Sequence, residues 1–544
     1  MLTPEELLEK LPEYDSQRQM ARALSIPEST LRRKLGHARR ARKTEPLPDH
    51  AFKPTEEQMP DTHVGNDGVK TEDLSSDTGI SRYIFTSAQN NTAVHQGFFN
   101  NLKAFTDFLG ARLVVSFNIY DKAGYRGPVV KGERQRLRRE LWWDKAVQPY
   151  VVNHRLKLAK RIAFCGELDI LATAKRPLSG MESYCRRSSI LVPHNRFQFH
   201  CVEARSQHMP KEMHTTGACT TRNFIQRKTG QLAAFHHILG ALLVEVDNAT
   251  GYFHVHHLNA DDDGSFYWID KRIADEKVYH NNDGIEALVL GDIHHEKLDS
   301  RESRIAGKIL GILEPKHVLI HDLIDFRSRN HHNRDNPLFR VSVANVKVEE
   351  ELQRAANWLA NLYRRSPRSA YHVVRSNHDE ALDRWIREAD WKKDPVNAAF
   401  YLELAHQAVV NAQAGLRFNS LEWAIEREFM NGSHLLPINF LRSDESLEIA
   451  GVECGIHGHI GPSGARGNPR GYSKLGFKTF TAHLHTPSIV DGCYTVGVLG
   501  KLDMDYNRGP SKWMHAHGIV YPNGKRAFLF SKNGHWRLPL KGGA

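Results

Sequence analysis

Five short polar segments between Asp292 and His485 contain the residue types that bind divalent metal ions. They are Asp292-Ile293-His294, Asp322 to Asp325, Asn377-His378-Asp379, His457, and His483-Leu484-His485. Carboxylate and amide oxygens, together with imidazole nitrogens, are ligands for ions such as Mn²⁺, Fe²⁺ and Zn²⁺. A single Asp-x-His or His-x-His is more often structural, so the prediction of a metal site depends on all five segments together.

Four of these segments directly follow an apolar run that predicts a buried β-strand. The runs are 287–290, 317–320, 371–374 and 479–481, and short apolar runs with β-branched residues are typical of strands buried on both faces. Strands that end at one edge of an α/β sheet bring the residues that follow them to one point. The segment that carries His457 is less clear as a strand end. We therefore expect these segments to converge at one edge of a sheet.

The order D-x-H, D-x-x-D, N-H-D, H and H-x-H resembles the calcineurin-like metallophosphoesterase superfamily, whose members use two metal ions to cut phosphoester bonds. The resemblance covers residues 281–544 and implies an α/β fold, a metallophosphoesterase β-sandwich flanked by helices. It also implies two adjacent ions that share one carboxylate. The first ion would be held by Asp292, His294 and His485, the second by Asn377, His457 and His483, and both by Asp322.

The same resemblance implies the catalytic chemistry. A water shared by the two ions would attack phosphorus as hydroxide, because two cations stabilise its negative charge. His378 would protonate the leaving oxygen or stabilise its developing charge, and Asp325 would orient His378 through a hydrogen bond. The mixed oxygen and nitrogen ligands favour Mn²⁺, with Mg²⁺, Fe²⁺ or Zn²⁺ as substitutes.

The sequence departs from the family pattern at several positions without losing a ligand. His321, Ser376 and Ala482 stand where the family usually has glycine. Phe326 stands where the protein-phosphatase branch has an arginine, and Arg327 comes one position later. This difference disfavours a phosphoprotein phosphatase.

Basic segments close to the predicted metal ligands favour a nucleic-acid substrate. The chain carries a net charge of +11, which favours a polyanionic partner. Arg327 and Arg329 follow the second polar segment, and Arg466 and Arg470 lie in a glycine-rich loop after His457. Such residues can grip a phosphate backbone, although ordinary surface loops with solvated charge would give the same pattern.

The N-terminal residues 1–43 predict a small helical module. Residues 16–23 and 28–38 read as helices joined by a turn, which resembles a helix-turn-helix. The basic residues expected to contact phosphate are Arg32, Arg33, Lys34 and Arg39. A solvated basic helix, or a packing module with no DNA role, is the alternative. Residues 44–80 are rich in proline and acids and predict a flexible linker.

Residues 81–280 predict a second α/β domain whose role the sequence does not assign. A strand at 82–85, a helix at 94–109 and a strand at 113–117 support this interpretation. The basic run 131–139 precedes Trp142 and Trp143, a combination that suits either a nucleic-acid surface or plain core tryptophans. Within 281–544, residues from about 380 to 445 predict a helical insert over the site, and 513–530 predict a hairpin.

These features lead to the prediction of a metal-dependent DNA nuclease that hydrolyses phosphodiester bonds by a two-metal-activated hydroxide. It is similar to the repair-nuclease branch of the superfamily and, more loosely, to the early DNA-degradation proteins of lytic bacteriophages. The alternatives are a phosphomonoesterase or cyclic-nucleotide phosphodiesterase, and a DNA-binding regulator with an inactive phosphoesterase fold.

The expected partner is DNA, with RNA as an alternative and with no membrane. No apolar stretch approaches the ~20 residues of a membrane-spanning helix, and the acidic N-terminus lacks the features of a secretory signal. The expected location is therefore the cytoplasm, that of the host if the protein is phage-encoded. Six scattered cysteines argue against a disulfide framework. The choice between exonuclease and endonuclease and the oligomeric state, with a homo-oligomer as one option, stay open.

Overall fold

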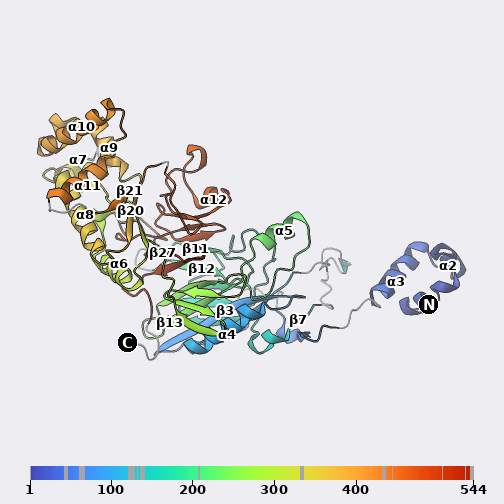
Figure 1. Ribbon diagram of the computed structural model, residues 1–544. Helices are drawn as coiled ribbons and strands as arrows, with labels where there is room; N and C mark the ends of the chain where they lie inside the picture. Colours follow the sequence, from blue (N-terminus) through green and yellow to red (C-terminus); the bar gives the residue numbers. More distant parts are fainter. Residues whose placement is uncertain are drawn as a thin grey trace. The chain divides into compact units, whose positions relative to one another are not determined.

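The computed structural model describes most of the chain as two compact units, Met1–Phe52 and Lys53–Ala544. The described residues are 2–41, 47–60, 68–120, 129–130, 133–134, 141–184, 186–205, 209–330, 336–431, 436–443, 445–504, 507–532 and 534–538. Each unit is described by itself. Figure 1 shows the elements and their labels.

The first unit contains three helices around a small apolar core. The helices are α1 (Pro4–Glu9), α2 (Gln17–Ala23) and α3 (Glu28–Ala41). Ser16 caps α2 by accepting a hydrogen bond from the backbone N–H of Gln19, as helix N-caps commonly do. The two helices expected from the sequence are confirmed as α2 and α3, and α1 is an addition. The core is formed by Leu7, Met20, Ala21, Leu31 and Leu35, with Leu24 and Ile26 packed against it.

The second unit is mixed α/β, as expected, and its strands form several sheets. The six-stranded sheet holds, in spatial order, β21 (Ile438–Phe440), β20 (Ala370–Val374), β19 (His317–His321), β18 (Ala287–Val289), β27 (Ala516–Val520) and β28 (Arg526–Phe530). Strands β18 to β21 are parallel to one another. The predicted hairpin is confirmed by the antiparallel pairing of β27 with β28.

A longer sheet of eleven strands lies against the six-stranded one. Its strands, in spatial order, are β2 (Thr71–Asp73), β8 (Arg155–Ala159), β9 (Ile162–Cys165), β10 (Ser189–Val192), β12 (Lys211–Thr215), β11 (Phe199–Val202), β25 (Ser488–Val490), β26 (Cys493–Thr495), β24 (Lys478–Thr481), β23 (Val452–Glu453) and β22 (Glu448–Ile449). One buried cluster joins the two sheets, with Val289 and Leu319 on one side and Phe480 and Tyr494 on the other.

The close approach of the two sheets depends on a glycine in β27. A Cβ atom at Gly518 would lie 2.4 Å from the ring of Phe480, far inside van der Waals contact. Any larger residue at 518 would therefore push the sheets apart beneath the polar segments.

The eleven-stranded sheet crosses the position expected to divide two domains. Phe199 of β11 pairs with Ile489 of β25 in an antiparallel ladder. Strands from 81–280 and strands from 281–544 thus belong to one sheet, and β2, within the expected linker 44–80, pairs with β8 at its edge. The proposed domain division at residue 280 stays a prediction.

The remaining strands complete the middle part of the chain. A four-stranded sheet holds β14 (Phe253–Asn259), β13 (Gly240–Asp247), β3 (Ile80–Gln89) and β4 (Arg112–Asn118). The expected strands at 82–85 and 113–117 are confirmed as β3 and β4. Smaller strands are β5 (Val129–Val130), β6 (Glu133–Arg134), β7 (Trp143–Asp144), β15 (Phe266–Trp268), β16 (Lys271–Ala274) and β17 (Lys277–His280). The short strand β1 (Ala51–Phe52) belongs to the first unit.

Trp143 is a core residue, one of the two readings that the sequence left open. It is fully buried, its ring stacks on that of Phe117 at 4.0 Å between centroids, and its indole N–H donates to the carbonyl of Ala88 at 3.0 Å. Side chains of the adjoining basic run 131–139 lie outside the described residues.

A buried ionic network connects the end of β28 to the middle of the chain. The Lys532 ammonium group pairs with the Glu212 carboxylate and donates to the carbonyl of Phe253 at 2.7 Å. Glu212 also pairs with His214 at 3.1 Å. Buried charges are tolerated when they are paired in this way, so the network ties β28 to β12 and β14.

The helices of the second unit gather mainly beside the six-stranded sheet, next to β20 and β21 (Figure 1). The helical insert expected at about 380–445 includes the helices α10 (Ala398–Gln413) and α11 (Ser420–Asn431). The helices are α4 (Gln96–Leu109), α5 (Lys228–Phe235), α6 (Ser300–Leu313), α7 (Pro337–Ser342), α8 (Val348–Tyr363), α9 (Glu380–Glu388), α10 (Ala398–Gln413), α11 (Ser420–Asn431) and α12 (Pro469–Tyr472). In the described part of the chain, no helix has both the length and the apolar character needed to span a bilayer.

Candidate metal centre

The polar segments follow strand ends at one edge of the two packed sheets. Asp292, Asp322 and Asn377 come shortly after β18, β19 and β20, which are parallel neighbours. His457 follows β23, and the segment 483–485 follows β24. The four strands expected in front of these segments are confirmed. Because both sheets end here, side chains reach this edge from both.

The backbone at the site adopts a conformation that side chains other than glycine seldom take. The φ angle is +46° at both His294 and Asp322, +72° at His483 and +54° at His485. Such left-handed residues are strained and persist where the surroundings fix them. The N–H of His294 donates to the carbonyl of Asp322 at 2.8 Å, which holds the first two segments together.

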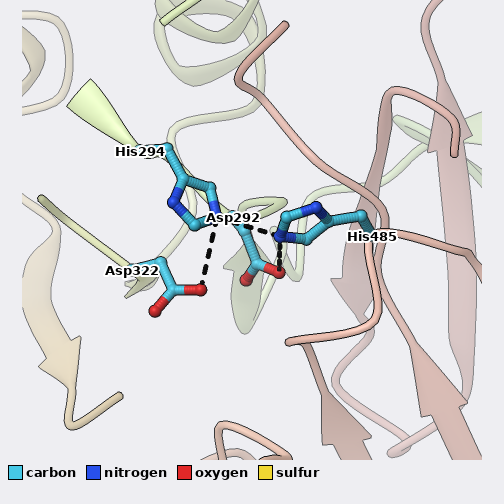
Figure 2. Close-up of side chains that lie close together, drawn as sticks. All are labelled: Asp292, His294, Asp322 and His485. Carbon is cyan, nitrogen blue, oxygen red and sulfur yellow. Dashed lines mark hydrogen bonds and ion pairs between the residues drawn. The ribbon is translucent and has the colours of Figure 1, made fainter. Parts of the chain in front are cut away.

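Asp292, His294, Asp322 and His485 form one compact cluster (Figure 2), with one ligand atom of each within 4.8 Å of the others. The Nε2 atom of His485 lies 3.2 Å from Oδ2 of Asp292. The Nε2 atom of His294 lies 3.4 Å from Oδ2 of Asp322. All four side chains are buried, so this group has the composition and the spacing to hold a divalent ion.

A second group adjoins the first at Asp322. The Nε2 atom of His457 lies 3.4 Å from the same Oδ2 atom of Asp322 and 3.2 Å from Oδ1 of Asn377. The ring of His483 lies 5.3 Å from that of His457, between centroids. Asp322 Oδ2 is thus shared between a histidine of each group. The seven side chains expected as ligands lie together.

The carboxylates of this cluster lack ordinary partners, as a cation site requires. Both oxygens of Asp292 and of Asp322 are buried without a hydrogen bond of ordinary geometry from the described residues. Buried polar groups in proteins are normally satisfied, and an unpaired buried charge is strongly unfavourable. Burial and the neighbouring charge of Asp322 raise the pKa of Asp292 well above its usual range. A bound cation would remove this conflict, so the residues fit a divalent metal ion.

Asp325 connects the cluster to His378. Its Oδ1 atom lies 3.2 Å from Nδ1 of His294 and 3.4 Å from Nδ1 of His378. Burial would lower the pKa of His294, but the charges of Asp322 and Asp325 raise it to about 9. Burial lowers the pKa of His378. The two residues expected as a catalytic pair are therefore adjacent, and His378 lies beside the ligand shell.

Two carboxylates that the sequence analysis did not single out hold the loop of Asp325. The Glu296 Oε2 atom accepts a hydrogen bond from the backbone N–H of Asp325 at 2.6 Å, and Asp379 Oδ1 accepts from the N–H of Ile324 at 3.3 Å. Asp379 is the last residue of the N-H-D segment, so its place in a polar segment could have indicated that it lies near the site. The position of Glu296, two residues after His294, carries no such signal.

His459 is a further histidine that the sequence analysis missed. Its ring lies 5.3 Å from that of His457 and 6.1 Å from that of His483, between centroids. The His457-Gly458-His459 spacing repeats the H-x-H pattern of 483–485, and this repeat could have revealed it.

The basic residues expected near the ligands differ in their surroundings. Arg329 makes a two-pronged ion pair with Asp394, at 2.5 and 2.8 Å, so its charge is engaged within the protein. The Arg327 guanidinium lies 5.7 Å from the centroid of the Phe339 ring. Arg466 is exposed on the loop between His457 and α12, and Arg470 is exposed on α12 itself. Of these four, the last two offer charge directly to solvent.

The basic residues of the first unit lie on α3. Arg32 and Arg33 are exposed, and Arg32 pairs with Glu28 at 2.7 Å. Lys34 donates to the carbonyl of Leu2 at 3.1 Å and so helps to close the unit. The side chain of Arg39 lies outside the described residues.

The fold and the site define a mixed α/β protein with a buried Asp/His cluster that has the ligands for divalent metal ions. No family model and no solved structure matches the chain. Its sequence is 38% identical over 472 residues to protein A1 of Escherichia phage T5, which covers 83% of this chain and 82% of that protein. The chain belongs to the family of this phage protein.

Proposed function

We propose that this protein is a metal-dependent nuclease of the metallophosphoesterase kind that hydrolyses phosphodiester bonds in DNA. The observation that carries the proposal is the position of Asp322, whose Oδ2 atom lies 3.4 Å from Nε2 of both His294 and His457. One carboxylate between two histidine-containing groups is the arrangement of a two-metal site.

In this proposal the first ion is held by Asp292, His294 and His485, and the second by Asn377, His457 and His483, with Asp322 shared. The mixed oxygen and nitrogen ligands favour Mn²⁺. When bound, such ions neutralise charge on the phosphoryl oxygens and lower the pKa of water.

The proposed role of His378 follows from which of its two ring nitrogens faces Asp325. Nδ1 is the atom that faces Asp325, at 3.4 Å from the carboxylate, so Nδ1 holds its proton there and Nε2 is left for the substrate. A phosphodiester beside the ring adds negative charge and favours protonation of Nε2, which then gives its proton to the leaving oxygen. Glu296 and Asp379 position this pair by holding the loop of Asp325.

Exposed basic residues support a nucleic-acid substrate over a small phosphoester. Arg466 lies on the loop that follows the proposed ligand His457, Arg470 lies on α12, and Arg32 and Arg33 lie on α3 of the first unit. Charges outside the ligand shell add little to binding of a small ester but can neutralise successive phosphates of a strand. The helix-turn-helix reading of the first unit, with DNA as its partner, belongs to the same proposal.

The test is to incubate the purified full chain with Mn²⁺ and four substrates: supercoiled plasmid, linear duplex, RNA, and bis(p-nitrophenyl) phosphate. We expect cleavage of DNA and of the small diester, both abolished by EDTA. Asp322→Asn should lower both rates at least about 100-fold, because it removes the shared charge. His406→Ala, at an exposed histidine of α10, is the matched control and should keep both rates.

Three outcomes would replace the proposal. Hydrolysis of the small diester, or of an aryl monoester, without cleavage of any nucleic acid would establish a phosphodiesterase or phosphomonoesterase of small substrates. Cleavage of RNA alone would change the substrate. DNA binding that Asp322→Asn leaves intact, with no hydrolysis by the unaltered protein, would indicate a regulator.

A further inference from the structure

A pocket of about 330 Å³ adjoins the candidate metal centre. Its wall includes the ligand His457, together with His459, Ile460, Tyr472, Leu475 and Phe477. This volume lies at the lower end of the range of about 300–1,000 Å³ for small-ligand pockets. Because a proposed ligand forms part of the wall, whatever binds here lies next to the group that is cleaved.

The outer wall of the pocket is apolar and exposed. Ile460, Leu475 and Phe477 keep 49%, 37% and 48% of their surface accessible. The Tyr472 hydroxyl donates to the carbonyl of Ile460 at 2.6 Å, which fixes the loop after His459 against α12. Apolar side chains grouped at a charged site are typical of a binding surface, and the face of Phe477 offers a platform for stacking.

The inner wall of the pocket is polar and is held in place. Arg375 pairs with Glu380 at 3.1 Å and with Asp383 at 2.5 Å. Glu453 accepts from the N–H of Gly455 at 2.6 Å. A planar ligand with donors and acceptors on its edge would find an apolar face and a polar end here.

Positive charge lies on the loop that borders the pocket. Arg466 and Arg470 are exposed on the segment that begins at Gly461 and Pro462, two residues of the pocket wall. A strand whose phosphate lies at the ligands would have its backbone beside these arginines.

We propose that the pocket binds an unstacked base of single-stranded DNA next to the phosphodiester that is cleaved. The inference rests on the proposed nuclease function and adds a substrate preference to it. A base paired within a duplex has its faces covered by its neighbours and must leave the stack to reach such a pocket. The protein should therefore cleave single strands and frayed ends in preference to closed duplex.

The experiment compares cleavage rates, with Mn²⁺, for a single-stranded oligonucleotide, for the same sequence as the duplex stem of a closed dumbbell with only the cuts within the stem counted, and for bis(p-nitrophenyl) phosphate. The unaltered protein should cleave the single strand at least tenfold faster than the dumbbell. In Phe477→Ala the ratio of single-strand to small-diester cleavage should fall about tenfold or more, in line with the contribution of one stacked base. Phe477→Tyr, which keeps the ring, should restore the ratio.

Two controls separate this inference from general effects. Phe235→Ala removes an aromatic side chain that is 79% exposed at the end of α5 and should leave the ratio unchanged. Scanning an abasic position along the oligonucleotide should reveal one position, next to the cut, that slows the unaltered protein but not Phe477→Ala.

Equal cleavage rates on the single strand and the dumbbell would overturn the inference, and so would equal effects of Phe477→Ala and Phe235→Ala. Neither result would contradict the proposed nuclease function. Failure to cleave any DNA, with or without hydrolysis of the small diester, would instead remove the proposed function and this inference with it.

Discussion

The Nε2 atoms of His294 and His485 lie 2.9 Å apart. The two imidazoles therefore face each other, as two side chains that would hold the same ion must. The two histidines come from different sheets, one after β18 and the other after β24. Their approach therefore brings together two parts of the core that are distant in the sequence.

Metal binding should stabilise the protein. An ion that binds only the folded chain adds about 2.7 kcal/mol at 100 times its Kd. Here it would also compensate the buried charge of Asp292 and Asp322, whose oxygens contact histidines but accept no hydrogen bond of ordinary geometry from the described residues. Thermal unfolding followed in EDTA and in Mn²⁺ should show a higher Tm with the ion. The same ion should have no effect on Asp322→Asn, and identical curves for the unaltered protein in both buffers would contradict the metal assignment.

Removal of the imidazole of His378 should slow chemistry without loss of metal. We expect His378→Ala to lower kcat on DNA by about 10²–10⁴-fold, the usual contribution of a general acid. The loss should be smaller for bis(p-nitrophenyl) phosphate, because p-nitrophenolate leaves without a proton. Elemental analysis should find the same metal content as in the unaltered protein.

Asp325→Asn serves as the comparison for His378→Ala. The Asp325 carboxylate lies 3.4 Å from Nδ1 of His378. Its replacement should leave the imidazole less well oriented and should reduce kcat on DNA as well. An equal loss on both substrates in His378→Ala would show that this histidine has another role.

Acidification should destabilise the fold through its buried neutral histidines. His194 is buried between the N–H of Arg196, from which its Nδ1 accepts at 3.1 Å, and the carbonyl of Leu171, to which its Nε2 donates at 3.2 Å. Burial lowers its pKa from 6.5 to about 3. The pKa of His194 is thus lower in the folded protein than in the unfolded chain, so the unfolded chain takes up a proton first as the pH falls. The stability that is present above pH 6.5 is therefore lost as the pH falls toward 3.

Each such histidine should make the free energy of unfolding fall by about 1.4 kcal/mol per pH unit in this window. His237, with a pKa lowered by burial to about 4, should add to the effect. Urea unfolding between pH 7 and pH 4 measures the slope. His194→Asn should reduce the slope and His406→Ala should not, whereas stability independent of pH would show that these groups titrate normally.

The buried ion pair of Lys532 with Glu212 should contribute far more to the free energy of unfolding than a surface ion pair does. Lys532→Met leaves a buried carboxylate without its cation, which should cost about 3–5 kcal/mol of unfolding free energy. The double variant with Glu212→Gln should regain part of the loss. Lys512→Met, which breaks an exposed pair with Glu203 at 3.0 Å, is the control and should cost less than about 1 kcal/mol. Similar losses for the two single variants in urea unfolding would refute the ranking.

Local patterns were enough to predict the elements that position the site. The apolar runs before Asp292, Asp322 and Asn377 became parallel strands because each is short, continuous and followed by polar residues. The helices predicted at 16–23 and 28–38 were equally local, because an amphipathic helix places its buried residues, here Ala21, Leu31 and Leu35, at helical spacing.

Contacts between distant segments were not predictable in the same way. Glu296 accepts a hydrogen bond from the backbone N–H of Asp325. Because almost every residue has a backbone N–H, the sequence does not show which one a distant carboxylate contacts. The pairing of Phe199 with Ile489 depends on how two parts of a sheet meet edge to edge. The engagement of Arg329 by Asp394 likewise follows from the tertiary fold, not from the basic character of its segment.

The ladder between β11 and β25 has a consequence for any attempt to cut this chain in two. Separation of the chain there would leave the edge of each strand unpaired, and bare edges invite aggregation. The similarity to the phage T5 protein extends over 472 residues, which is longer than segment 281–544 and so reaches into the middle of the chain. The strands that complete this sheet thus come from both sides of residue 280, and residues 281–544 expressed alone would leave the edge of β25 open to solvent.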